Sequence, residues 1–286
     1  MITNTNAAAT VAKYNLEQTN AKLQKSLLRL SSGLRIHSAM DDAGGLAVSL
    51  KLSAAIRRTD SASVNVGNAL SFLQSQDGVL KVAGSILDRM SELATLASDG
   101  AKSEDDRELY ETEYLELSEQ MVDLTEEEFN GIPLFSNPAG TLTVRTSENG
   151  SQTTGVSQVD LESIILVATG LAANITDAAL ATTAMETLDT QIQNLAVLSA
   201  SNGAQQSRLS YAFDVLTVNR LNLEAANSRI MDADLAREST EYAKRNIISQ
   251  AGVAMLAQAN TTPERALKLL DSISNQRGHG EHRGGS

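Results

Sequence analysis

Few side chains in this sequence are of the types that do chemistry at neutral pH, and their spacing matches no catalytic motif. The histidines are His37, His279 and His282, and the absence of cysteine excludes disulfides and thiolate chemistry. No G-x-S-x-G, G-K-[ST] or H-E-x-x-H motif is present. His279 and His282 lie in a Gly-rich stretch, which does not preorganise metal ligands. We therefore expect no catalytic, cofactor-binding or metal site, and no enzyme.

Two pairs of neighbouring carboxylates are the remaining candidates for acid–base chemistry. They are Asp41 with Asp42, and Asp232 with Asp234. Asp is also one of the residues preferred at helix N-caps, where its carboxylate accepts backbone N–H groups. We expect these four side chains to cap helices or to face water.

The chain is acidic, with 23 Lys and Arg against 35 Asp and Glu, and the excess is local. Residues 104–128 hold twelve Asp and Glu but one basic residue, Arg107, so this segment carries −11 of the net charge of −12. Nucleic-acid binding needs clustered Lys and Arg and is disfavoured. The sequence contains no run of 18 apolar residues, the length that a membrane-spanning helix needs. The acidic run is typical of a solvated helix face.

Composition and periodicity both predict long helices. The chain has five Tyr, four Phe and no Trp, and its prolines are confined to positions 133, 138 and 263. Apolar residues recur every three or four positions over 66–97 and again over 110–124, which predicts an antiparallel helical hairpin. The same spacing continues over 181–230, which predicts a single long helix despite polar residues at its centre.

The middle and the two ends of the chain differ from this pattern. Residues 141–144 alternate in polarity and are followed by a turn sequence at 148–151, which predicts a small β-hairpin in the region 136–176. The ends carry thinner apolar stripes, over residues 16–34 and 247–270, with no partner nearby in the sequence. Each stripe must therefore pack against a distant segment or another molecule.

Three segments together resemble bacterial flagellin, the subunit of the flagellar filament. Residues 29–50 read RLSSGLRIHSAMDDAGGLAVSL, and residues 220–258 read RLNLEAANSRIMDADLARESTEYAKRNIISQAGVAMLAQ. The third segment is Phe129-Asn130-Gly131, after the acidic helix. The resemblance covers roughly residues 1–135 and 180–270 in the order found in flagellins. A hook–filament junction protein is similar at its ends, but there the Asp-Asp pair is typically followed by Pro, whereas Ala43 follows it here.

The resemblance implies a mainly α fold: a long antiparallel helical hairpin and a long C-terminal helix in a coiled-coil-like bundle, paired terminal helices, and a small β-hairpin in the middle. Flagellins pair their terminal helices in an inner tube and place the hairpin and long helix in an outer tube. The expected domains are an inner-tube helix at 1–40, outer-tube segments at 41–135 and 177–235, a variable region at 136–176, an inner-tube helix at 236–275 and a polar flexible tail at 276–286. Large outer domains are missing.

The resemblance also assigns roles to the apolar stripes. The residues expected at the assembly interface are Leu16, Leu23, Leu27, Leu30, Leu34, Ile247, Ala251, Met255, Leu256, Leu267 and Leu270. The residues expected in the outer-tube core are Leu73, Leu80, Leu87, Met90, Leu188, Ile192, Leu195, Leu209, Phe213, Leu216 and Leu223. Matching by motif, a contact with an animal Toll-like receptor falls on Arg89, Leu93 and Glu113.

The function implied is self-assembly into the helical filament used for swimming. The alternative is a hook–filament junction protein or a specialised minor flagellin. The expected partners are copies of the same chain, an export chaperone, and hook-associated junction and cap proteins. The implied location is the extracellular filament, reached through the flagellar type III apparatus without a cleaved signal peptide.

Overall fold

The structure, a computed structural model, describes residues 6–170 and 174–280, with side chains as far as residue 261 and at Arg265 and Lys268. The contacts divide the chain into two compact units. The terminal unit contains Met1–Lys51 and Ala226–Ser286, and the central unit contains Leu52–Ala225. Because the divisions fall at 51/52 and 225/226, residues 41–51 and 226–235, which we assigned to the outer tube, group with the terminal helices.

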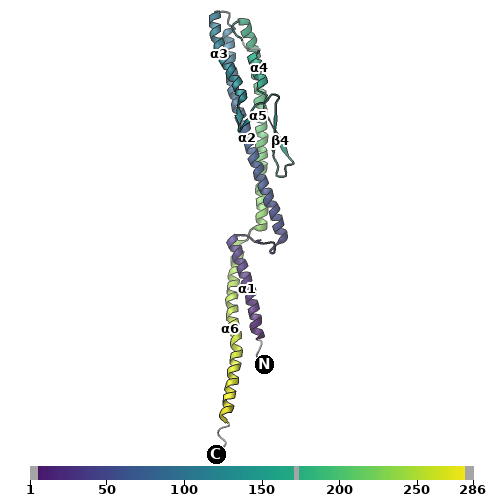
Figure 1. The fold of residues 1–286 in the computed structure, drawn as a ribbon, viewed down its shortest axis with the longest axis vertical. Coiled ribbons are helices and arrows are strands. Elements are labelled where there is room, and N and C mark those ends of the chain that lie inside the picture. Colours follow the sequence, from purple (N-terminus) through teal and green to yellow (C-terminus); the bar gives the residue numbers. More distant parts are fainter. Residues whose placement is uncertain (1–5, 171–173, 281–286) are drawn as a thin grey trace, which may run out of the picture. The chain divides into compact units, whose positions relative to one another are not determined.

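The central unit is built on the predicted antiparallel hairpin and long helix (Figure 1). Helix α2 (Ala43–Ala97) is followed by α3 (Glu104–Asp123) and a short 3₁₀ turn, η1 (Leu124–Glu126). A capping box begins α3: the Ser103 side chain accepts from the Asp106 backbone, and the Asp106 side chain accepts from the Ser103 backbone. The acidic first turn of α3 also suits the positive end of the helix dipole. Helix α5 (Ala178–Met231) is the predicted single long helix.

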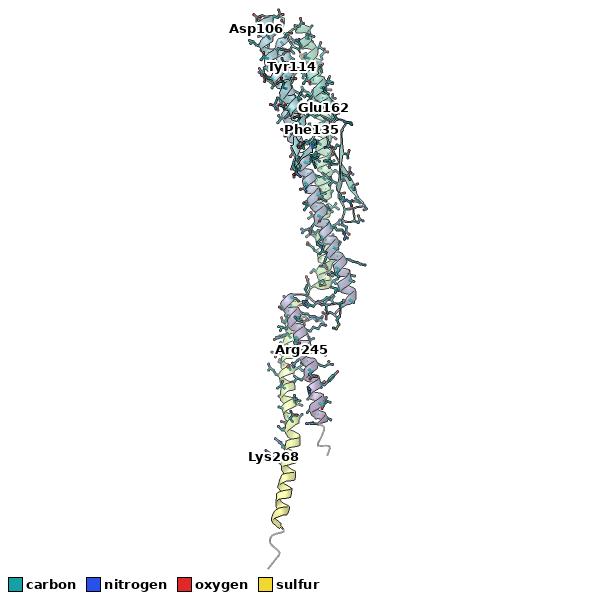
Figure 2. All side chains as sticks on the ribbon, in the orientation of Figure 1. Asp106, Tyr114, Phe135, Glu162, Arg245 and Lys268 are labelled. Carbon is teal, nitrogen blue, oxygen red and sulfur yellow. The ribbon has the colours of Figure 1, made fainter. Side chains whose placement is uncertain are left out.

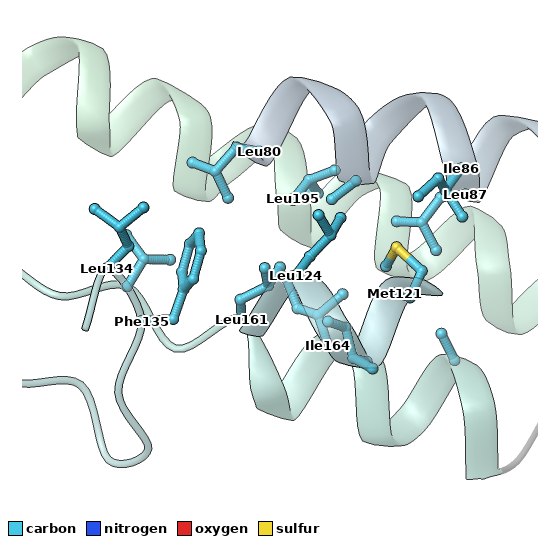
Figure 3. Close-up of a cluster of buried hydrophobic side chains, with 14 of the residues drawn as sticks. Leu80, Ile86, Leu87, Met121, Leu124, Leu134, Phe135, Leu161, Ile164 and Leu195 are labelled. Carbon is cyan, nitrogen blue, oxygen red and sulfur yellow. The ribbon is translucent and has the colours of Figure 1, made fainter. Parts of the chain in front are cut away.

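The apolar rows of these helices meet in one elongated core, part of which Figure 3 shows. Of the eleven expected core residues, eight are buried: Leu73, Leu80, Leu87, Met90, Leu188, Leu195, Leu209 and Leu216. Ile192 and Leu223 are half-buried. Phe213 is 42% exposed, so placing it in this core was wrong. Helix α3 is shorter than α2 and α5 and ends at residue 123. The part of α5 that carries Phe213 therefore packs on fewer elements, and the buried face of α5 is narrower in that part.

A buried polar layer crosses the middle of this core. Gln76 Nε2 donates to the Leu134 carbonyl at 2.7 Å, and Gln76 Oε1 accepts from Asn202 Nδ2 at 2.6 Å. Asn202 Oδ1 in turn accepts from Gln206 Nε2 at 2.5 Å. Because each buried amide would be costly without a partner, this layer favours one register of α2 against α5. The polar positions that interrupt the apolar pattern in the sequence therefore have a structural role.

Two small hairpins follow α3. Strands β1 (Glu128–Phe129) and β2 (Ile132–Pro133) are joined by Asn130 and Gly131, whose φ values of 53° and 74° belong to the tight hairpin turn that Asn-Gly favours. Strands β3 (Thr141–Arg145) and β4 (Thr153–Ser157) form the predicted β-hairpin. The region 136–176 also contains helix α4 (Glu162–Gly170), which we did not predict. A short apolar run such as residues 164–168 does not distinguish a strand from a buried helix.

The terminal unit is a pair of helices. Helix α1 (Ala7–Ser32) packs antiparallel along α6 (Leu235–Gly280) (Figure 1), as expected for the paired terminal helices. Helix α6 continues to Gly280, beyond the boundary that we placed at residue 275, and residues 281–286 lie outside the described part of the chain. Among the described helices, none has an apolar stretch sufficient to cross a membrane.

Candidate functional site

Polar side chains hold α1 and α6 together along their length. Near the free end of the pair, Asn6 Nδ2 donates to the Ala259 carbonyl at 2.9 Å. Further along, Ser249 Oγ donates to Asn20 Oδ1 at 2.7 Å. These bonds fix the antiparallel register, but each hydrogen bond adds only about 0.5–1.5 kcal/mol because water competes for the same groups.

The other end of the pair carries the strongest polar contacts. Arg245, labelled in Figure 2, donates from its guanidinium to Ser26 Oγ and, at 2.9 Å, to the Lys22 carbonyl. Ser26 is fully buried. Nearby, Arg29 Nη1 lies 3.5 Å from Glu238 Oε2, and both side chains are largely buried. Sequence reasoning did not select these residues, because they interrupt an apolar stripe.

Hydrophobic burial in the terminal unit is nearly absent. In its described part, Ile36 is the one hydrophobic residue that is buried, with 1% of its surface exposed. Large apolar side chains are instead open to solvent: Val11, Tyr14, Leu27, Leu28, Met40, Val48, Leu50, Leu235, Ile247, Ile248, Val253 and Met255. A two-helix unit of this kind buries too little apolar surface to offset its conformational entropy.

The expected assembly residues divide between two faces. Four face inward and are half-buried: Leu16, Leu23, Leu30 and Leu34. Leu256 is half-buried too, whereas Leu27, Ile247, Ala251 and Met255 are exposed. The side chains of Leu267 and Leu270 lie outside the described part of the chain. The exposed residues thus form an apolar surface that the chain itself does not cover.

An apolar groove of about 690 Å³ runs between the two helices toward the start of α1. Its walls include Val11 and Leu16 from α1, and Ile248 and Met255 from α6. Gly252 lets α6 lie close to α1 here, because a Cβ there would lie 3.2 Å from a Leu16 methyl group. The groove is wide, and its lining side chains are mostly small or exposed. An apolar face of another helix could therefore occupy the groove and remove this lining from water.

Backbone hydrogen bonds join the segment between α1 and α2 to the segment between α5 and α6. Arg35 N donates to the Met231 carbonyl at 2.6 Å, and Ala233 N donates to the Gly33 carbonyl at 2.8 Å. Gly33 ends α1 with a φ of 71°, a conformation that glycine adopts without strain. These bonds anchor both junctions to each other within the terminal unit.

The paired carboxylates at these junctions are caps and turn anchors, as expected. Asp42 Oδ1 accepts from Gly45 N at 2.8 Å at the start of α2, and Asp234 Oδ1 accepts from Arg237 N at 3.1 Å at the start of α6. Asp232 accepts from Ser228 Oγ. Within residues 6–170 and 174–280 no three potential ligands cluster as they would around a metal.

Asp41 organises the turn before α2. Its carboxylate pairs with the Lys25 ammonium group and accepts from the backbone of His37 at 3.1 Å and of Ser38 at 3.3 Å. The hydrogen bond from Lys25, followed by that from His37, lowers the pKa of Asp41 to about 2. The carboxylate is therefore charged at all ordinary pH values, and it ties this turn to α1.

Replacing Gly45 by alanine is expected to weaken the junction between α1 and α2, whereas the same change at Gly44 is not. A Cβ at Gly45 would lie 2.5 Å from Asp42 Oδ2 and 2.7 Å from Ile36 Cδ1, so we expect a cost of about 1–3 kcal/mol. At Gly44 the nearest atom would be 3.7 Å away, and alanine is the better helix former. Melting of assembled filaments should show a lower midpoint for Gly45→Ala only. Equal midpoints would contradict this close packing.

The residues matched to a receptor contact lie in the central unit. Arg89 Nε is 2.7 Å from Glu113 Oε1, and Arg89 Nη1 is 2.9 Å from Glu92 Oε2. The hydrogen bond that Arg89 donates to Glu113 lowers the pKa of Glu113 and raises the pKa of Arg89. Leu93 is 1% exposed, so its side chain lies inside the bundle. The structure thus presents Arg89 and Glu113 at the surface, but not Leu93.

Comparison with known proteins agrees with these features. The family model described as "Bacterial flagellin N-terminal helical region" matches residues 3–139, and "Bacterial flagellin C-terminal helical region" matches residues 185–270. A flagellin of Halalkalibacterium halodurans is 38% identical over 274 residues, covering 94% of this chain and 100% of that protein. The flagellar filament 33 kDa core protein of Treponema phagedenis is 36% identical over 293 residues, with coverage of 94% and 100%.

A solved structure from Vibrio parahaemolyticus, described as a flagellar hook-associated protein, has a TM-score of 0.59, and the match covers 67% of this chain and 100% of that one. At 13% identity, this likeness concerns the fold alone. The family models, in contrast, match most of this sequence, and both relatives are matched over their whole length. This chain therefore belongs to the bacterial flagellin family.

Proposed function

We propose that this chain, a structural subunit of the flagellar filament, polymerises through its terminal unit. The observation that carries the proposal is that the described part of the terminal unit leaves twelve large apolar side chains exposed, nine of them on α1 and α6, and buries Ile36 alone among its hydrophobic residues. Copies of the same chain would cover these side chains. Burial of a Leu, Ile or Met side chain contributes about 1.5–3 kcal/mol, so several per subunit suffice to drive assembly.

The mechanism proposed is coupled folding and binding. Monomer ends that are marginal alone become stable when neighbouring subunits complete their burial. Contacts between different faces of identical subunits extend into an open helix when they do not close into a ring, which suits a filament that transmits torque for swimming. The small variable region leaves the central unit at the filament surface.

Electron microscopy of purified protein left to polymerise tests this proposal. We expect long helical filaments from the chain alone. A hook–filament junction protein would not elongate by itself, so short or absent filaments under conditions that polymerise other flagellins would favour that alternative. An export chaperone and the junction and cap proteins are further proposed partners, by family resemblance, and the proposed location is the extracellular filament.

Salt is expected to accelerate assembly. Among the twelve carboxylates of residues 104–128, all within the described part of the chain, Glu113 alone forms an intramolecular ion pair. Repeated around a tube, the others repel over about 8–10 Å at physiological ionic strength. The lag before polymerisation, followed by light scattering, should shorten as salt rises from low to moderate concentration. A constant lag would mean that Lys or Arg of neighbouring subunits already neutralises these charges.

Recognition by an animal Toll-like receptor is proposed through Arg89 and Glu113. Each group is about half exposed, and the ion pair holds both in fixed positions. Arg89→Ala would remove a charged donor and release Glu113, so a receptor reporter assay with monomer should show a clearly reduced response. The matched control is Arg57→Ala, an exposed arginine elsewhere on α2. Equal responses from the native chain and Arg89→Ala would remove the claim.

A further inference from the structure

The β3–β4 hairpin has one open edge. Gln158 N donates to the Gly140 carbonyl at 2.9 Å, and Thr146 N donates to the Gln152 carbonyl at 3.1 Å. In an antiparallel ladder every second residue exchanges hydrogen bonds with its partner. With the observed register, the backbone groups of Thr141, Thr143 and Arg145 therefore point away from β4.

The opposite edge of the hairpin is bonded to the helical bundle at Ser157. Ser157 N on β4 donates to Gln205 Oε1 at 2.8 Å, and the Ser157 carbonyl accepts from Gln76 Nε2 at 3.4 Å. Figure 1 shows β4 beside α5, the helix that carries Gln205. On β3, in contrast, no described residue bonds to the outward backbone groups. An unpaired strand edge of this kind is a template for another strand.

The open edge faces a groove of about 670 Å³, which we call the strand groove. Strand β3 forms one wall, and α2 with the β1–β2 turn forms the other. Its apolar lining includes buried Phe72 and Val156, and the ring of Phe129 meets that of Phe72 edge-on at 6.2 Å. Such a floor can take the side chains that an added strand would direct toward it.

Amide side chains line the wall opposite β3. Asn65 and Asn68 on α2 and Asn130 in the β1–β2 turn border the strand groove, and all three are exposed. Their side chains make no hydrogen bond to any described residue, so their donors and acceptors are free. A carboxamide can bond both the N–H and the C=O of a peptide backbone. One wall thus offers strand-type backbone groups and the other offers side chains suited to the same kind of ligand.

We propose that the strand groove binds an extended polypeptide segment, which adds to the free edge of β3 as a further strand. Backbone groups of Thr141, Thr143 and Arg145 give the main-chain hydrogen bonds, and the apolar floor selects apolar side chains at alternate positions. A strand of about five residues matches the length of β3. This binding surface is distinct from the terminal unit and does not require polymerisation.

Fluorescence anisotropy with full-length monomer tests the proposal. The probe is a labelled peptide, acetyl-Thr-Val-Thr-Val-Thr-amide, and a version with methylated backbone nitrogens is the control probe. Saturable binding of the first peptide, and none of the second, is expected. Absence of saturable binding, or equal binding of both peptides, would overturn the proposal.

Two variants locate the binding. Thr143→Pro removes an outward N–H that β4 does not use, and Asn68→Trp fills the groove from an exposed position. Each should weaken peptide binding by about tenfold or more. Gln74→Trp, on an exposed face of α2 away from the groove, should bind as the native chain does. Circular dichroism checks that all variants are folded. Undiminished binding by both test variants would place the peptide elsewhere and sink the proposal.

A second copy of the chain is the competing occupant. Sedimentation of monomer without peptide distinguishes the two. A dimer that Thr143→Pro abolishes, and that the peptide dissociates, would reassign the groove to self-association and overturn the proposal as stated. A monomer that binds the peptide supports it. Filament growth is scored separately by electron microscopy, so failure here does not affect the polymerisation proposal.

Discussion

Removing residues 240–286 is expected to abolish filament growth and to leave the central unit folded. The deletion takes away most of α6, and with it the partner of α1 and exposed apolar residues such as Ile247 and Met255. The central unit keeps its core, because nearly all buried hydrophobic residues lie between Ala55 and Leu216. Electron microscopy should show no filaments, while circular dichroism should show a cooperative helical melt.

A shorter deletion is the matched control for this experiment. The family match ends at residue 270, so removing 271–286 should leave polymerisation intact. Limited proteolysis gives an independent readout: monomer should lose roughly its first forty and last fifty residues, since ends of this kind are marginal alone. The same sites should be protected in filaments. Monomer ends as resistant as the centre would show that intramolecular docking of α1 on α6 is enough.

Leu87→Ala is expected to destabilise the central unit by about 2–5 kcal/mol. Leu87 is fully buried and lies near Met121 and Leu124 in the core of Figure 3, where α2, α3 and α5 meet. Its truncation removes apolar burial and leaves a cavity that the three helices cannot easily close. Urea unfolding of monomer, followed by far-UV circular dichroism, measures the change in the free energy of unfolding.

The control for Leu87 lies on the same helix. Val82 is 50% exposed, and Val82→Ala should change the free energy of unfolding by no more than about 0.5 kcal/mol. Comparable losses from the two substitutions would mean that the core does not lie on the face of α2 that carries Leu87. A loss from Leu87→Ala alone supports the packing described.

The long helices could be predicted because their apolar spacing repeats over many turns. The rows that include Leu80 and Leu188 each define one face of a helix, and no proline interrupts them. The β3–β4 hairpin could be predicted from alternation and a turn sequence of four residues. Helix α4 could not, because an apolar run as short as residues 164–168 carries no clear period.

The candidate site in the terminal unit could be predicted from the sequence only in part. Apolar stripes without local partners indicated that the two ends pair, and they do. The stripe at the C-terminal end does not, however, reveal which residues face α1. Arg245 and Ser249 face it, whereas Ile247 and Met255 are exposed, because register between two helices depends on contacts between side chains far apart in sequence.

By itself, then, the sequence determined the helical class, the β-hairpin and the flagellin resemblance, all of which depend on local periodicity or on contiguous motifs. Only the tertiary structure decided which polar groups are buried together and which backbone edge stays open. Gln76 and Asn202 are separated by 126 positions, yet they share one hydrogen bond across the bundle. The bundle bonds the β4 edge at Ser157, whereas no described residue bonds the outward backbone groups of β3, because hydrogen-bond satisfaction is settled by three-dimensional packing and not by local pattern.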